Sequence, residues 1–124
     1  MSFRGPAQWF KDIIQSVERI ERHIDGMGFD EFREDIKTID AVERNLQKLS
    51  EAAIRLGPQG EALCPGPPWN DIRGLGNWLR HQYDRVDLET IWHTVTADLP
   101  PLKAAVTLAL QRLSAPESEP PSLG

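Results

Sequence analysis

The chain has 124 residues and a mass of 14.0 kDa, the size of one ordinary domain and too short for two separate hydrophobic cores. Fourteen Lys and Arg against 19 Asp and Glu give a net charge of −5, so overall charge predicts no general polyanion-binding surface and any nucleic-acid contact must be local. The apolar runs stop well short of the ~18 residues that a membrane span needs. The N-terminus has no apolar signal region and Cys64 has no second cysteine to pair with. We therefore expect a cytoplasmic protein with no membrane association.

The first predicted element is an amphipathic helix over roughly residues 6 to 25, ended by Gly26 and Gly28. Its apolar residues recur every three or four positions, at Phe10, Ile13, Ile14, Val17, Ile20 and Ile24. A second helical run over residues 30 to 56 carries two apolar columns seven residues apart, Ile39, Leu46 and Ala53 beside Val42, Leu49 and Leu56. These columns predict a seam for packing against partner helices. Residues 37–38 hold no apolar side chain, so one unbroken helix and two helices joined by a bend both stay open.

The second half of the chain is also predicted to be helical, apart from a proline-rich loop over residues 57–68. Helical spacing resumes over residues 69–79 and 88–95, and a last helix follows over 101–113, where Asp98 is placed to cap a helix that has prolines in its first turn. Residues 1–113 then form one domain, and 114–124 a disordered tail. No alternating strand pattern occurs. The predicted fold is all-α, an up-and-down bundle of four or five helices.

Metal and cofactor chemistry have no support in the residue pattern. Cys64 is alone, and His23, His81 and His93 lie at unrelated spacings on three predicted helices. Gly74 and Gly76 lie within a helical run with no strand before them, so no nucleotide-binding glycine loop is present. We expect neither a metal nor a cofactor.

One dense segment, residues 69–87, does carry candidate chemistry. On a helix, Arg73, Asn77 and His81 fall at positions i, i+4 and i+8 and share one side, here called the polar row. Arg80 and Arg85 bring the segment to three Arg against three Asp, so it is less acidic than the rest of the chain and suits a phosphate.

These residue types fit metal-free RNA cleavage, in which a ribose 2′-OH attacks the adjacent phosphorus. Such a reaction needs a base, an acid and a group that stabilises charge on the phosphate. Imidazole titrates near neutral pH and serves as acid or base, and a guanidinium holds phosphate oxygens with paired hydrogen bonds. Because this segment holds one histidine, His81, two chains would have to share a site in a homodimer for two imidazoles to act.

The chain resembles the HepT-like branch of the HEPN superfamily, the toxin partners of minimal nucleotidyltransferases in prokaryotic toxin–antitoxin pairs. The resemblance covers about residues 8–113 and rests on the order and spacing of several short segments. These are IDAVERNL (39–46), EA (51–52), PW (68–69), IRG (72–74), NWLRHQY (77–83), VD (86–87), IW (91–92) and DLPPL (98–102). It implies an all-α homodimer with a metal-independent ribonuclease site in the dimer cleft, acting on RNA and not on DNA.

The resemblance also implies roles for individual residues. His81 matches the catalytic histidine, Asn77 the polar residue that follows the signature arginine, and Tyr83 the tyrosine to which the nucleotidyltransferase antitoxin adds AMP. The arginine is missing, because Gly76 stands at its position. Either Arg73 supplies the guanidinium from the polar row, which the helical geometry favours, or Arg80 supplies it from beside His81, or cleavage has been lost.

Three functional hypotheses therefore stay open at this level. In the first, the chain is a ribonuclease toxin with His81, Asn77 and Arg73 as catalytic residues and Arg80 as a further candidate phosphate contact. In the second, it is a non-cleaving module that binds a nucleotidyltransferase or a nucleotide. In the third, it is a generic helical adaptor in which changing the site residues has only small effects on stability.

Overall fold

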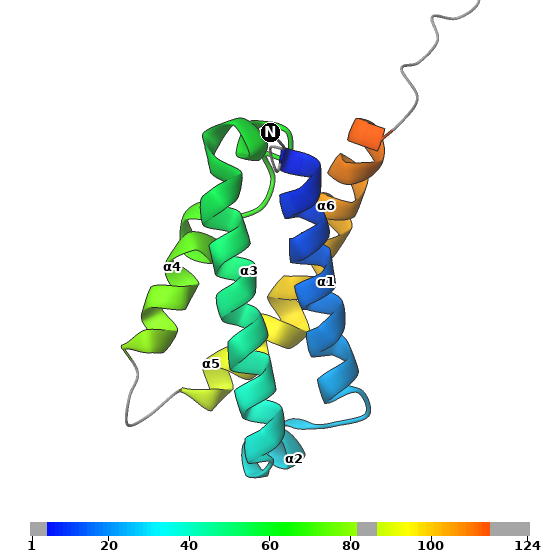
Figure 1. The fold of residues 1–124 in the computed structure, drawn as a ribbon. Helices are drawn as coiled ribbons and strands as arrows, with labels where there is room; N and C mark the ends of the chain where they lie inside the picture. The colour runs from blue at the N-terminus through cyan, green and yellow to red at the C-terminus, as the bar shows by residue number, and fades with distance from the viewer. Residues whose placement is uncertain (1–4, 82–86, 115–124) are drawn as a thin grey trace, which may run out of the picture.

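The computed structural model describes residues 5–81 and 87–114, and within those ranges every regular element is helical. In chain order these are α1 (Pro6–Ile24), α2 (Phe29–Glu34), α3 (Ile36–Ala62), α4 (Trp69–Arg80), α5 (Leu88–His93), the π-helical turn η1 (Thr94–Asp98) and α6 (Leu99–Ser114). Figure 1 shows α1 and α3 running antiparallel through the centre of the bundle, with α4 beside α3 and α6 beside α1. The predicted all-α bundle is confirmed.

The first helix forms as its sequence predicts. Pro6 lies in its first turn, where a missing backbone N–H is no loss. The apolar side of α1 is buried in the core, with Phe10 and Ile13 fully enclosed. The helix ends at Ile24, and Gly26 takes a φ of 78°, a left-handed conformation that glycine adopts without strain.

The second helical run is broken at Asp35, two residues before the region where a bend was open to question. Asp35 has an extended conformation (φ −107°, ψ 91°), and its side chain accepts a hydrogen bond from the Thr38 backbone N–H at 3.1 Å. This hydrogen bond, the main cause, holds the pKa of the Asp35 carboxyl below its usual value of 3.8. A strong N-cap therefore divides the run into α2 and α3.

The seam on α3 is used within this one chain. Val42, Leu46, Leu49 and Ala53 are fully or almost fully enclosed, packed among the buried residues of the other helices. Contacts of α3 with α1 on one side and α4 on the other account for this burial. The seam is therefore not free to pair with a second chain, and a dimer would have to use other surfaces.

The predicted loop over residues 57–68 is wrong for its first part. At Gly57 the backbone turns with φ 66° and ψ −178°, which kinks the helix, and one more helical stretch follows to Ala62. Pro58 directly follows the kink and so begins a new helical turn, where a residue without an N–H is tolerated. The true connection is shorter and runs only from Leu63 to α4.

The last part of the chain is one continuous helical run, and the predicted N-cap at Asp98 is wrong. Asp98 lies within η1, and its carboxylate is 3.8 Å from Nε2 of His93 instead of capping α6. Pro100 and Pro101 lack the N–H groups that would bond the carbonyls four residues earlier, and they follow directly after the π-helical turn η1, in the first turn of α6. In the part of the chain that the structure describes, no helix is long and apolar enough to cross a membrane.

Candidate active site on α4

The helix α4 packs one side against the bundle and leaves the other exposed. Trp69, Ile72, Gly76 and Leu79 are buried, while Asn77, Arg80 and His81 face solvent. The start of the helix is fixed by Trp69, whose indole Nε1 donates a hydrogen bond to the Cys64 carbonyl at 2.7 Å. Because the buried side is anchored at both ends, the exposed side chains are held on a rigid support.

His81 lies at the C-terminal end of α4. Its backbone N–H reaches the carbonyls of Asn77 and Trp78, both at 3.2 Å, so the backbone is still tied to the last helical turn. Asn77 precedes it by four residues, and both side chains are exposed. The structure therefore presents an amide and an imidazole one turn apart, open to a ligand as large as RNA.

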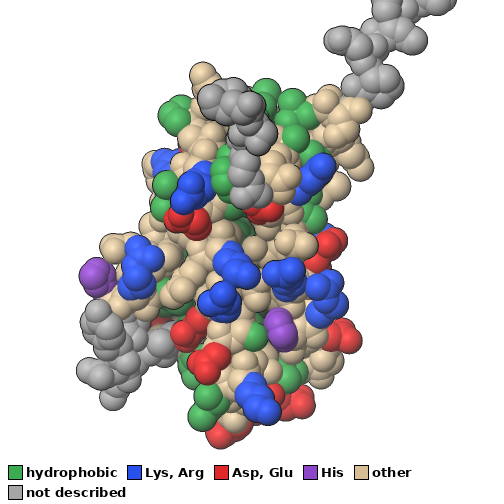
Figure 2. Space-filling model, in the orientation of Figure 1, with side chains coloured by type: hydrophobic (Ala, Val, Ile, Leu, Met, Phe, Trp, Pro, Cys, Tyr) green, Lys and Arg blue, Asp and Glu red, His purple; other side chains and the backbone are tan. Residues whose placement is uncertain are grey.

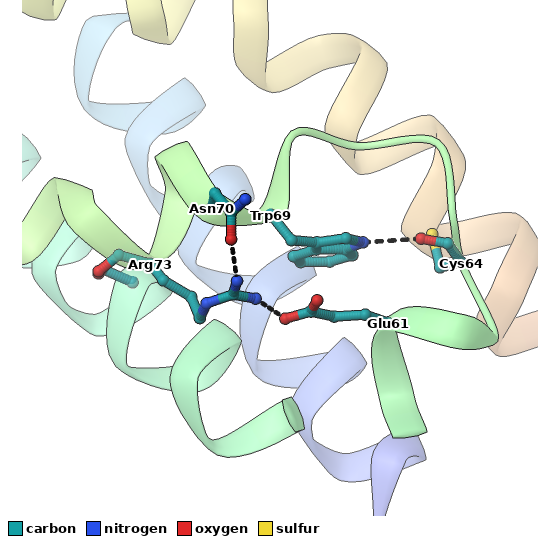
Figure 3. A network of polar contacts seen from close by, with 6 residues as sticks. Glu61, Cys64, Trp69, Asn70 and Arg73 are labelled. Atoms are coloured by element: carbon teal, nitrogen blue, oxygen red, sulfur yellow. Dashed lines mark hydrogen bonds and ion pairs between the residues drawn. The ribbon is translucent and has the colours of Figure 1, made fainter. Parts of the chain in front are cut away.

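Arg73, the first member of the polar row, is engaged elsewhere. Its guanidinium forms an ion pair with the Glu61 carboxylate and donates a hydrogen bond to the Asn70 side-chain oxygen. Figure 3 shows this side chain extended toward the end of α3 and the first turn of α4. The guanidinium thus ties the last turn of α3 to α4, and it must leave Glu61 before it can bind a phosphate beside Asn77 and His81.

Gly76, which stands where the resemblance implies an arginine, is a point of close contact between α3 and α4. Its backbone N–H donates to the Ser50 hydroxyl at 3.1 Å, and that hydroxyl donates to the Arg73 carbonyl at 3.0 Å. A Cβ atom on residue 76 would lie 3.2 Å from the Ser50 oxygen. The two helices therefore approach closely because residue 76 has no side chain.

Arg80 places a guanidinium next to this glycine. Its Nη1 lies 3.8 Å from the position that a Cβ of residue 76 would occupy. Side chains on a helix lean toward the preceding turn, and Gly76 leaves that space empty. Arg80 is exposed and has no ion-pair partner among the described residues. It is therefore better placed than Arg73 to meet a ligand at this end of α4.

Sequence reasoning missed two residues that shape the site. Glu61, which holds Arg73, falls in the segment predicted to be a loop, and nothing in its local pattern marks it as a partner. Ser50 gave only a weak sequence signal, as a small polar residue next to the apolar seam. The structure shows that it is buried. Its role depends on residues 23 and 26 positions away, which no local pattern reveals.

The remaining candidate residues can now be located. Tyr83 and Arg85 lie outside the described residues. Among the residues that are described, no group of His, Cys, Asp or Glu could hold a metal ion. Trp69 is buried, and Trp92 packs against the Phe32 ring with 5.1 Å between the ring centroids. Cys64 is buried, and this burial raises the pKa of its thiol, which makes it less reactive.

Comparison with known proteins agrees with the resemblance. The family model described as Ribonuclease HepT-like matches residues 13–108. A protein from Thermococcus cleftensis named "Probable ribonuclease HepT" is 33% identical over 100 residues, which span 81% of this chain and 91% of that protein.

Other relatives extend the same match. A protein from Caldanaerobacter subterraneus subsp. tengcongensis, named as a candidate RNase, is 28% identical over 109 residues, or 88% of this chain and 97% of that protein. Another named in the same way, from Methanocaldococcus jannaschii, is 34% identical over 89 residues, or 72% of this chain and 74% of that protein. No solved structure gives a significant match. Because the family model matches nearly the whole of the helical bundle, the chain belongs to the Ribonuclease HepT-like family.

Proposed function

We propose that the chain is a metal-independent endoribonuclease, the toxin of a prokaryotic toxin–antitoxin pair. The observation that carries this proposal is the exposed pair of His81 and Asn77 at the end of a rigid α4, in a chain of the Ribonuclease HepT-like family. The three relatives described above are named for ribonuclease activity, which supports the same reaction here.

In this reaction the RNA supplies its own nucleophile. An imidazole accepts the proton of a ribose 2′-OH as its oxygen attacks the adjacent phosphorus, and an imidazolium returns a proton to the departing 5′ oxygen. The product is a 2′,3′-cyclic phosphate. His81 of each protomer in a homodimer would supply one of these two groups, and the Asn77 amide would orient a phosphate oxygen.

A guanidinium is needed for the charge that builds up on the phosphate. The contacts favour Arg80 for this role, because it lies beside Gly76 and is exposed, whereas Arg73 is held by Glu61 and Asn70. Arg73 contributes only if it exchanges Glu61 for phosphate.

The antitoxin partner is proposed to be a minimal nucleotidyltransferase that adds AMP to Tyr83. Tyr83 follows His81 by two residues. An AMP group there adds negative charge and bulk next to the imidazole, so it would repel and block an RNA phosphate. We place the pair in the cytoplasm, where its RNA substrate is found.

The decisive experiment measures cleavage of a mixed RNA in excess EDTA by purified protein shown by mass to carry no AMP. We expect cleavage by the parent and none by His81→Ala. His93→Ala is the matched control, because His93 is also exposed but lies on α5, and it should cleave like the parent. Parent protein that is folded, unmodified and inactive would contradict the proposal.

The arginines are separated in the same assay. Arg80→Ala should lower the cleavage rate by at least ~100-fold, the typical cost of removing a charge-stabilising group, and Arg73→Ala should lower it much less. The reverse order would assign the phosphate contact to Arg73.

One observation favours a second function, a non-cleaving module that binds the nucleotidyltransferase or a nucleotide. The family's arginine position is a buried glycine, so the usual guanidinium is absent there. If this function is correct, unmodified protein does not cleave RNA, and Gly76→Arg creates cleavage. Ser50→Ala is combined with this change, because the Ser50 hydroxyl otherwise occupies the space beside residue 76.

A further inference from the structure

A second polar surface lies on the side of α3 away from α4. A groove of 1080 Å³ runs between α1 and α3, and we call it the basic groove. Its lining is mainly polar and consists of Trp9, Asp12, Gln15, Ser16, Arg19, Arg44, Gln47, Lys48, Glu51, Ala52 and Arg55. Figure 2 shows Lys and Arg side chains gathered at mid-height over α1 and α3.

Positive charge prevails in the groove although the chain as a whole has a net charge of −5. The acidic side chains in it are already engaged. Glu51 pairs with Arg55 at 3.0 Å, and Asp12 accepts a hydrogen bond from Gln8 at 3.0 Å. Arg19, Arg44 and Lys48 have no ion-pair partner among the described residues, in contrast to Arg33, Arg73 and Lys103. Three cations are thus left to bind an anion.

The groove also offers a contact for a base. The Arg55 guanidinium lies over the Trp9 ring, 5.8 Å from its centroid, at one end of the groove. The amides of Gln15 and Gln47 add neutral donors and acceptors along its length. Guanidinium and amide groups next to an indole are the groups with which proteins bind the backbone and bases of single-stranded nucleic acid.

The groove lies across α3 from the candidate active site. Ser50 on α3 contacts Gly76 on α4, and the two helices are antiparallel (Figure 1). Arg80, one turn after Gly76, is therefore level with the turn of α3 that precedes Ser50. Arg44 and Lys48 of the groove belong to this same section of α3. The groove and Arg80 therefore lie at the same level of the bundle, with α3 between α1 and α4.

We propose that the basic groove binds the sugar–phosphate backbone of RNA beyond the nucleotides that are cleaved. This inference rests on the proposed ribonuclease function for the identity of the polyanion. Arg19, Arg44 and Lys48 contact phosphates, and an RNA strand crosses α3 to reach His81. Long RNAs are therefore held at two places, and the groove contributes affinity without sequence specificity.

The test measures binding of a fluorescent 20-nucleotide RNA in which every ribose is 2′-O-methylated. This probe has no 2′-OH nucleophile, so binding is measured separately from cleavage. The triple variant Arg19→Gln, Arg44→Gln, Lys48→Gln removes the three unpaired cations. The matched control, Lys11→Gln, Lys37→Gln, Arg112→Gln, makes the same change in net charge at exposed positions outside the groove.

We expect the groove variant to bind the RNA at least ~10-fold more weakly at 100 mM salt. The slope of its log affinity against log salt concentration should be shallower by ~2, because each phosphate contact on a single strand contributes about 0.7 to that slope. The control should keep the parent's slope. Arg19→Lys with Arg44→Lys keeps the charge and should keep most of the affinity. A groove variant that matches the control in affinity and slope overturns the proposal.

Two further outcomes would also overturn it. In one, the groove variant retains RNA binding but loses binding to the nucleotidyltransferase. In the other, it changes from dimer to monomer in sedimentation. Either result assigns the groove to a protein. His81→Ala separates this test from that of the proposed function. If His81→Ala abolishes cleavage while the groove variant binds RNA normally, the enzyme is correct and the groove inference fails. If the groove variant loses binding and the parent never cleaves, the groove inference stands alone.

Discussion

Gly76 and Arg73 show how the same residue types serve packing or chemistry according to their contacts. In the sequence, Arg73 shares a helix side with Asn77 and His81, and Gly76 marks a missing arginine. In the structure, Arg73 ties two helices together through Glu61, and Gly76 allows those helices to approach. Arg80, leaning back over Gly76, becomes the better candidate for phosphate binding.

Arg73→Ala should lower the free energy of unfolding by about 1–3 kcal/mol, because it leaves the largely buried Glu61 carboxylate without its partner. Urea unfolding measures this. Adding Glu61→Gln should recover part of the loss, since a neutral amide is cheaper to bury. Arg33→Ala, which breaks exposed ion pairs, should cost no more than about 1 kcal/mol. An equal loss from the two arginines would show that the Glu61 pair is unimportant.

Gly76→Ala should destabilise the protein, because an overpacking cost of about 1–3 kcal/mol outweighs the gain of about 1 kcal/mol from helix propensity. The Ser50 hydroxyl is held by two hydrogen bonds and cannot move aside freely. Gly74→Ala is the control on the same helix: no atom lies within 4 Å of its Cβ position, so it should stabilise by about 1 kcal/mol. Thermal or urea unfolding of both variants tests this prediction. If both substitutions stabilise the protein, α3 and α4 have room for a Cβ at residue 76.

At the scale of the elements, two aspartates set where helices begin. Asp35 caps α3, and Asp87 caps α5 by accepting from the Thr90 backbone N–H at 3.1 Å and from the Thr90 hydroxyl at 2.6 Å. Hydrogen bonds from Thr38 and Thr90 respectively hold the pKa of each carboxyl below 3.8. Both helices therefore begin with an ionised cap at neutral pH.

These caps predict a loss of stability in acid. A carboxyl whose pKa is lower in the folded state stabilises the fold above its unfolded pKa, and this contribution disappears as the pH falls below about 3.8 through the folded pKa. The urea midpoint should therefore decline over that range. Asp35→Asn with Asp87→Asn keeps an acceptor at each cap without a charge. The double variant should show a smaller decline, and an unchanged decline would exclude the caps as its cause.

At the scale of the whole molecule, the expected homodimer must use surfaces other than the α3 seam, which is buried within the protomer. Ile54, one turn after Ser50 on α3, is an apolar side chain that is 51% exposed. It lies on the part of α3 that approaches α4, so a second copy placed there would also meet the exposed side of α4.

We therefore expect sedimentation equilibrium to give about twice the 14.0 kDa chain mass, and Ile54→Glu to yield a folded monomer that no longer cleaves RNA. Leu108→Glu, at a site of similar exposure (48%) on α6, should stay dimeric. A parent that is monomeric and cleaves RNA would show that one His81 suffices and that the shared site is wrong.

The sequence by itself determined the helices and their buried sides, because the spacing of apolar residues repeats over a few positions and a helix is a local structure. It also placed His81 and Asn77 together, one turn apart. It failed where the outcome depends on residues distant in the chain or on backbone details. The helical turn after Gly57 and the continuous helix through Asp98 are examples, since proline and aspartate have the same local preferences in a loop and at a helix start.

Only the tertiary structure decided which polar groups pair and which remain open. Arg73 pairs with Glu61, and Ser50 contacts Gly76, because α3 and α4 pack at a particular distance and in a particular register. That distance and register depend on all the contacts between the two helices. In the same way Arg19 and Arg44, 25 residues apart in the sequence, line one groove only because α1 and α3 lie antiparallel. Local periodicity fixes the side of a helix on which a residue lies, and packing alone fixes what it meets there.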